Sequence, residues 1–200
     1  MLDVARIQRN MTERDIREAL EAYSPGRIER EGFRRAAVLV PLLEVEGAWH
    51  LLFTKRSEDL EHHRGQVSFP GGALDDGEDP EDAALRETFE EIAIGPGHVH
   101  LLQRLDELWT PSGYIITPVV GFLHSTETLQ PSAAEVSRVF TAPLPFFSQP
   151  GAAEVRRVTV NGYTRNVYFY HHDSETIWGA TAFIIRNLLR VLGLIDAPDA

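Results

Sequence analysis

The chain contains no cysteine among its 200 residues. That absence excludes a disulfide framework, a thiolate metal site and a cysteine nucleophile. The sequence also lacks an apolar run long enough for a bilayer-spanning helix, and its first residues are too polar and charged for a secretory leader. We therefore expect a cytoplasmic protein that has no membrane partner.

Positive charge is scarce as well. Lys and Arg total 19 against 30 Asp and Glu, which gives a formal net charge of −11. This balance argues against a nucleic-acid-binding surface. It also repels an anionic substrate at long range, so such a substrate needs bound cations or a local basic patch. Lys55, Arg56 and Arg64 belong to the densest basic cluster and are the candidates for that patch.

The length and the hydrophobic content of 43% predict one globular domain over residues 1–200. Residues 1–30 are expected to form an N-terminal helical extension, with a helix over 12–23 that Thr12 caps. A C-terminal helix is expected at 175–195, with its apolar register over 177–194. Strands are expected at 36–44, 49–55, 66–69, 99–108, 115–123, 155–160 and 164–170.

Two short turns join pairs of these strands. Glu46-Gly47 separates the first pair, and Asn161-Gly162 gives the strongest hairpin signal in the chain. The mixture of strands with helices predicts an α+β fold, in which helices pack on a mixed sheet.

A glycine loop that runs into a helix carries the strongest functional signal. Gly71-Gly72 precedes Asp79, a good N-cap residue, and Pro80, which suits the first helical position. Leu85, Phe89 and Ile92 recur at i, i+4 and i+7, so they are expected to form the buried stripe of this helix.

The opposite face of that helix concentrates acids. Glu87, Glu90 and Glu91 fall there, and the i, i+4 pair of like charges costs about 0.2–0.5 kcal/mol unless a cation neutralises it. Arg86 lies at the edge of the face, where its fork could brace a carboxylate. An acidic helix face is ordinarily only solvated surface, but the adjoining glycine loop favours a site that holds Mg²⁺ or Mn²⁺ against phosphate.

The same run resembles the Nudix box. Two positions depart from its pattern, Thr88 at an apolar site and Ala93 at the last glycine. The matching positions within 71–94 are Gly72, Glu78, Arg86, Glu87, Glu90, Glu91 and Ile94. The resemblance implies an αβα sandwich with the Nudix loop-helix, and a metal-dependent hydrolase that cleaves nucleoside diphosphates linked to another group.

The segment before the box is similar to the coenzyme A diphosphatase branch of that family. The runs LFTKRS at 52–57 and GQVSFPGG at 65–72 carry this similarity, while Glu61 stands where the branch commonly has arginine. Matching runs continue at 110–114, 117–122 and 177–182. The resemblance implies a small-molecule substrate, coenzyme A, cleaved to 3′,5′-ADP and 4′-phosphopantetheine. A Nudix diphosphatase for ADP-ribose or NADH, and a catalytically silent Nudix fold, are the alternatives.

Roles for individual residues follow from the resemblance. Glu87, Glu90 and Glu91 are expected to bind the metal, and Lys55, Arg56, Arg64, Gly71 and Gly72 to contact the substrate. An acid outside the box commonly serves as the base, and Glu135 is the first candidate, with Glu127 second. Trp109, Tyr114 or Phe147 could stack on an adenine. The sequence carries no signal for an oligomeric state.

Overall fold

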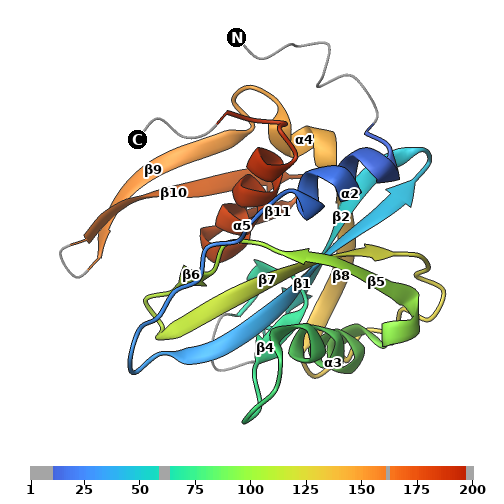
Figure 1. Ribbon diagram of the computed structural model, residues 1–200, viewed down its shortest axis with the longest axis horizontal. Coiled ribbons are helices and arrows are strands. Elements are labelled where there is room, and N and C mark those ends of the chain that lie inside the picture. The colour runs from blue at the N-terminus through green and yellow to red at the C-terminus, as the bar shows by residue number, and fades with distance from the viewer. Residues whose placement is uncertain (1–10, 59–63, 161–162, 197–200) are drawn as a thin grey trace.

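An eight-stranded mixed sheet forms the centre of the protein (Figure 1). The computed structural model describes residues 11–58, 64–160 and 163–196. The strands of this sheet are β1 (Arg34–Val45), β2 (Ala48–Arg56), β3 (Val67–Ser68), β4 (Gly71–Ala73), β5 (Val99–Arg104), β6 (Leu108–Trp109), β7 (Tyr114–Leu123) and β8 (Val136–Pro143). Five of them lie in the order β3-β2-β1-β7-β5, while β4 pairs with β1, β6 with β7 and β8 with β2. The central pair β1–β7 is parallel, and the sheet is therefore mixed.

A smaller sheet and the helices complete the fold. The second sheet has the order β11-β10-β9 and consists of β9 (Ala153–Val160), β10 (Tyr163–His172) and β11 (Glu175–Trp178). The helices are α2 (Glu13–Glu21), α3 (Pro80–Ile92), α4 (Leu144–Ser148) and α5 (Gly179–Val191), with a short 3₁₀ helix η1 (Pro96–His98). Figure 1 shows α3 on one side of the large sheet and α2 and α5 on the other.

Side-chain alternation along β1 divides the core between these two sides. Ala37 and Leu39 pack with Ala83 and Ala84 of α3. The larger cluster on the other side takes in Val40 and Leu42 together with apolar residues of α2 and α5. Because successive residues of a strand point to opposite faces, one apolar strand supplies both layers. The fold is thus the expected α+β sandwich.

Several of the expected elements are confirmed. Thr12 caps α2 in a capping box, in which its side chain accepts from the Asp15 N–H and Asp15 accepts from the Thr12 N–H. The turn between β1 and β2 is at Glu46 and Gly47, whose φ angles of 50° and 79° are left-handed. Strands β9 and β10 pair as expected. The turn at 161–162 lies outside the described residues.

Other boundaries were wrong. The C-terminal helix begins at Gly179, because 175–178 is the strand β11, in which Trp178 pairs with Phe169. The expected strand 99–108 ends at Arg104, and Leu108–Trp109 forms the separate strand β6. Strands β4 and β8 were not predicted. Polar side chains at Ser137 and Arg138 interrupt the apolar pattern of β8, so its pairing with β2 decides its conformation.

Asp106, in the connection between β5 and β6, joins the N-terminal segment to α5. Its carboxylate accepts the Gly26 N–H at 2.7 Å, Asn187 Nδ2 at 3.0 Å and Arg190 Nη2 at 2.8 Å. Burial alone would raise the pKa of Asp106. Hydrogen bonds from the Tyr23 hydroxyl and the Gly26 N–H, with the charge of Arg190, outweigh burial and lower the pKa.

Asp106→Asn should therefore destabilise the protein. The variant loses the charge opposite Arg190 and presents an amide to donors, which should cost about 2 kcal/mol at pH 7 in the free energy of unfolding. Since the folded-state pKa is lowered, the contribution is present above about pH 4 and disappears as the pH falls through the lowered pKa. Urea unfolding at several pH values measures both effects. Glu18→Gln, at the exposed pair with Arg14, is the control and should leave the midpoint unchanged; equal losses in both variants would contradict the assignment.

Candidate active site

The helix that carries the acids is rotated relative to the sequence expectation. Helix α3 begins at Pro80 with Asp79 at the cap position, although in the described structure the Asp79 side chain makes no cap hydrogen bond. Phe89 is 56% exposed, so the expected apolar stripe through Leu85 and Phe89 was wrong. The buried side holds Ala83, Ala84, Thr88, Glu91 and Ile92. Alanine side chains let the helix approach the sheet closely, and this rotation carries one of the three acids into the interior.

Arg86 connects the loop to the helix acids. Its Nε and Nη2 donate to the two carboxylate oxygens of Glu78 at 2.9 and 3.0 Å, and Nη2 also donates to the Ala73 carbonyl at 3.1 Å. Its Nη1 donates to Glu87 at 2.8 Å and lies 3.4 Å from both oxygens of Glu90. The Arg86 hydrogen bond lowers the pKa of Glu78. Arg86 therefore braces the box, as the sequence suggested, and its first partner is Glu78.

Glu91 is the buried acid of the site, with 2% of its surface exposed. Burial raises its pKa to about 8 against the opposing charge of Arg56, and the nearby charges of Glu87 and Glu135 add to the rise. Arg56 Nη1 lies 3.8 Å from Glu91 Oε1. Among the described residues, neither Glu91 Oε2 nor Arg56 Nε has a hydrogen-bond partner, though both are buried. Within the described residues, the paired side chains of Glu91 and Arg56 can thus each make one more hydrogen bond, Glu91 as an acceptor and Arg56 as a donor.

Two glycines bring backbone against the acids. A Cβ on Gly72 would lie 2.4 Å from Cδ of Glu87, so the carboxylate occupies the space that a side chain would need. A Cβ on Gly71 would lie 2.3 Å from the Ala37 carbonyl oxygen, and its φ of 151° favours glycine. Gly72 therefore makes room for Glu87, while Gly71 serves the pairing of β4 with β1.

Glu135 lies beside the same acids, although it is far from them in sequence. Its charge raises the pKa of both Glu87 and Glu91, which requires proximity. Backbone hydrogen bonds hold its position, from the Ser57 N–H to the Glu135 carbonyl at 2.8 Å and from the Glu135 N–H to the Ser132 carbonyl at 3.0 Å. Of the acids that the sequence analysis singled out, Glu87, Glu91 and Glu135 thus lie near one another. Glu90 lies further out, with half of its side chain exposed.

The donor set fits a hard divalent cation. It consists of carboxylates, one of them with a buried oxygen that has no hydrogen-bond partner in the described part of the chain, and a cation would relieve their mutual repulsion. Within residues 11–58, 64–160 and 163–196, however, no three His, Cys, Asp or Glu side chains already converge as a metal site. Arg86 holds Glu87 and Glu90 instead. Metal binding would therefore use the carboxylate oxygen of Glu87 that Arg86 does not engage, and Glu90 would have to turn away from Arg86.

The three basic residues predicted to contact the substrate do not lie together. Arg56 and Lys55 are successive on β2, and their side chains leave on opposite faces of the sheet. Arg56 faces Glu91, whereas Lys55 Nζ lies 3.0 Å from Glu175 of β11. Arg64 is exposed in the turn that precedes β3. Arg138 of β8 shares Glu175 with Lys55, and sequence reasoning did not single it out, because β8 itself was not recognised.

The remaining candidates differ in burial and in their partners. Phe147 is 2% exposed in the core, so the expectation that it stacks on a substrate was wrong. Trp109 packs edge to face with Phe33 and under Arg30, and Tyr114 lies under Arg34. Glu127 is an exposed loop residue. None of the described helices is long and apolar enough to cross a membrane.

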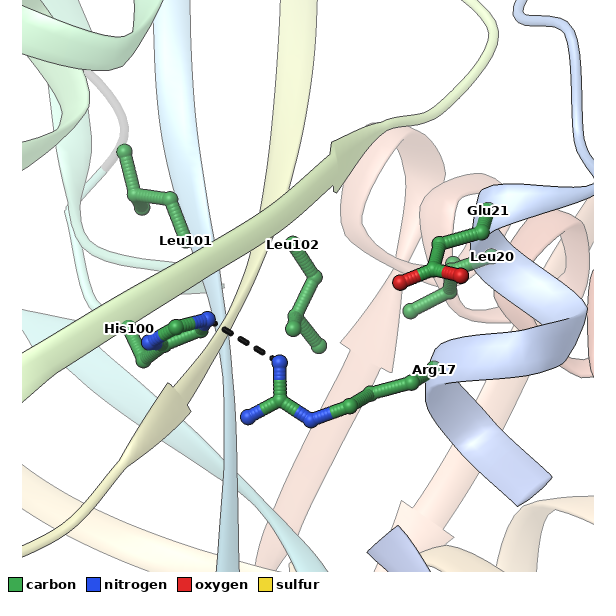
Figure 2. Close-up of a pocket in the computed structure, with 6 residues that line it drawn as sticks. All are labelled: Arg17, Leu20, Glu21, His100, Leu101 and Leu102. Atoms are coloured by element: carbon green, nitrogen blue, oxygen red, sulfur yellow. Dashed lines mark hydrogen bonds between the residues drawn. The ribbon is translucent and has the colours of Figure 1, made fainter. Parts of the chain in front are cut away.

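A small cavity opens elsewhere in the molecule (Figure 2). It encloses about 100 Å³ between α2 and β5, and its lining includes Arg17 and His100, which are joined at 2.9 Å. None of the acids described above lines it. This cavity is therefore not part of the candidate active site.

Comparison with known proteins identifies relatives. The model of the NUDIX domain family matches residues 33–161. The Photorhabdus laumondii protein named "Uncharacterized Nudix hydrolase NudL" is 39% identical over 160 residues, covering 78% of this chain and 83% of the relative. The protein of the same name from Escherichia coli K12 is 36% identical over 189 residues, covering 93% of this chain and 97% of the relative.

Solved structures share the fold at lower identity. DR0079 from Deinococcus radiodurans aligns with a TM-score of 0.52 and 17% identity over 78% of this chain and 83% of that one. The Nudix hydrolase RenU from M. smegmatis aligns with a TM-score of 0.50 and 22% identity over 58% and 74% of the two chains. At these identities the likeness bears on the fold alone.

Replacing each of the two glycines by alanine should distinguish an effect on metal binding from an effect on stability. In Gly72→Ala the new methyl displaces the Glu87 carboxylate, so Mn²⁺ binding should weaken about tenfold while the unfolding temperature stays near that of the parent. In Gly71→Ala the methyl meets backbone at a left-handed φ, which should cost about 2 kcal/mol or more of stability. Mn²⁺ titration and thermal unfolding measure the pair, and unchanged Mn²⁺ affinity in Gly72→Ala would count against Glu87 as a ligand.

Glu91 should make the metal-free protein less stable as the pH rises. Its folded-state pKa of about 8 lies above the ordinary value of a glutamate. The protonated form is therefore favoured by folding, and the associated stability is complete below about pH 4.3 and is lost as the pH rises through about 8. Unfolding in a chelator from pH 5 to about 9 should show this loss in the parent and not in Glu91→Gln. Glu90→Gln, on the exposed side of α3, is the control and should keep the parent profile.

Proposed function

Because the chain belongs to the Nudix hydrolase family, whose members cleave phosphoric anhydrides, we propose that it hydrolyses the diphosphate of coenzyme A. The products are 3′,5′-ADP and 4′-phosphopantetheine. One observation carries the proposal: Arg56, from the segment that resembles the coenzyme A diphosphatase branch, faces Glu91 of the box. The spare buried donor of Arg56 and the spare buried acceptor of Glu91 suit an anion and a cation that arrive together.

The surrounding strands support this assignment. The segment 52–57 lies on β2 and the segment 65–72 leads through β3 into β4, so both halves of the resemblance reach the acids. Strand β3 pairs with β2 at Lys55↔Val67, and β4 pairs with β1 at Ala37↔Gly72. The segment that carries the coenzyme A resemblance and the box are therefore joined by strand pairing as well as by sequence.

The chain's own residues would divide the chemistry as follows. Arg86 orients Glu87 and ties the loop through Glu78. Glu87, Glu90 and Glu91 would hold Mg²⁺ or Mn²⁺, which when bound neutralises the diphosphate and polarises a P–O bond. Arg56 would donate to a phosphate oxygen, and the absence of a side chain on Gly72 leaves Glu87 its place.

Glu135 is the proposed general base. It lies close enough to Glu87 and Glu91 to raise their pKa, and backbone hydrogen bonds fix its main chain beside the end of β2. A carboxylate in this position could accept the proton of the attacking water while the water approaches phosphorus. Glu135 stands apart from the fork of Arg86, which engages Glu78, Glu87 and Glu90.

The test is product analysis with coenzyme A, ADP-ribose and NADH, each with Mg²⁺ or Mn²⁺. We expect release of 3′,5′-ADP from coenzyme A at a kcat/KM at least about tenfold above that for the other two. Preferred cleavage of ADP-ribose or NADH would keep the Nudix chemistry and refute the substrate. No turnover of any of the three would favour the silent fold.

Variants of the box acids serve as the matched controls in that assay. Glu91→Gln should lower kcat by roughly two orders of magnitude or more, because a neutral amide cannot replace the carboxylate. Glu18→Gln, on the exposed face of α2, should retain parental kcat. Near-parental turnover by Glu91→Gln and by Glu90→Gln would refute the site assignment.

A further inference from the structure

A second cationic cluster lies on the other face of β2. Lys55 of β2 and Arg138 of β8 stand directly opposite one another in the antiparallel pair. Lys55 Nζ lies 3.0 Å from Oε2 of Glu175, and Arg138 Nη1 lies 3.0 Å from Oε1 of the same carboxylate. Like charges directly opposite in a sheet repel, so this pairing calls for anions.

Glu175 neutralises only part of the positive charge of Lys55 and Arg138. Its side chain is 7% exposed and is held between the two cations, so it can neutralise one of their two positive charges. The Arg138 side chain is 46% exposed and uses one fork nitrogen for Glu175. A guanidinium carries five N–H donors, so Arg138 can bind a second anion from the solvent side without releasing Glu175.

Backbone adjacency and hydrogen bonds connect this cluster to the candidate active site. Lys55 precedes Arg56, which faces Glu91, and the Ser137 hydroxyl donates to the Lys55 carbonyl at 3.1 Å. The Ser57 N–H donates to the carbonyl of Glu135, just before β8. The same short stretches of β2 and β8 therefore present one cation to the acids and a surplus cation to the opposite side.

We propose that Lys55 and Arg138, held by Glu175, form a subsite for a phosphomonoester on the nucleoside half of the substrate. This inference rests on the proposed function, because coenzyme A carries such a group, the 3′-phosphate, one ribose away from its diphosphate. In a chain of net charge −11, a phosphomonoester needs a local site of surplus positive charge. An exposed arginine fork above a buried carboxylate supplies that charge without burying an unpaired cation.

The test compares 3′,5′-ADP with 5′-AMP, which differ only in the 3′-phosphate. By calorimetric titration the parent should bind 3′,5′-ADP about tenfold more tightly than 5′-AMP. Arg138→Gln should lose most of this preference while its affinity for 5′-AMP stays the same. Arg138→Lys should restore part of it. Arg156→Gln, which removes an exposed arginine paired with Glu154 on β9, is the matched control and should keep the parental preference.

Kinetics give a second measurement of the same subsite. Arg138→Gln should raise KM for coenzyme A about tenfold, leave KM for dephospho-coenzyme A within about twofold, and leave kcat unchanged. Lys55 still neutralises Glu175 in this variant, so the fold should survive, and thermal unfolding checks this. Equal effects on both members of either ligand pair, or no effect on either, would overturn the subsite.

The two proposals fail in different ways. If the parent prefers 3′,5′-ADP through Arg138 but does not hydrolyse coenzyme A, the subsite stands and the proposed reaction is wrong. If coenzyme A is hydrolysed and Arg138→Gln treats coenzyme A and dephospho-coenzyme A as the parent does, the reaction stands and the subsite is wrong.

Discussion

The fork of Arg86 is the contact on which the geometry of the site depends. One planar side chain joins the end of the glycine loop at Glu78, the carbonyl of Ala73 on β4, and Glu87 on α3. A guanidinium can do this because its donors lie in a fixed plane and point in several directions, whereas an ammonium is a compact point charge. The loop and the helix are therefore held in register even though the neighbouring acids repel one another.

The close approach of α3 and β4 to β1 makes one carboxylate of the site harder to ionise. Ala83 and Ala84 let α3 approach the sheet, and Gly71 lets β4 approach β1. This tight packing carries Glu91 into the interior, where burial raises its pKa. The fold thus places a carboxylate where it is costly to ionise without a counter-ion. A buried acid beside further carboxylates gains most from a divalent cation, which links the packing of a helix to the affinity of a site.

The positions of the acids could be predicted from sequence because they depend on local spacing. Glu87, Glu90 and Glu91 lie within two turns of one helix, and the turn residues before it mark its start. The rotation of that helix could not be predicted from periodicity, because the polar Thr88 is buried and the apolar Phe89 is exposed. The Thr88 hydroxyl donates to the Ala84 carbonyl at 2.6 Å. Which side faces inward depends on the alanines that fit the sheet, and apolarity alone does not report fit.

Contacts between segments that are distant in the sequence could not be predicted from the hydrophobic pattern either, because the pattern reports only local spacing. Glu135 was placed near the acids through family resemblance, whereas Arg138 was missed because β8 has no clear alternation. At Ala93, by contrast, the structure explains a departure from the box pattern that was visible in the sequence. Its φ of 57° is the left-handed conformation that ends α3. The box pattern has glycine there because glycine adopts this conformation at least cost, so the departure at Ala93 bears on how the helix ends.

Alternation along β2 gives the two proposals a common physical origin. Arg56 and Lys55 differ by one position, so they deliver positive charge to opposite faces of one strand. On one face that charge meets a buried acid with a spare acceptor, and on the other it meets a buried acid that two cations already share. The first arrangement leaves an anionic site that a metal and a diphosphate can complete together. The second leaves a cationic site that an anion can complete alone. A substrate with a diphosphate and a separate phosphomonoester would match both at once, and a substrate with the diphosphate alone would leave the charge of Arg138 to solvent.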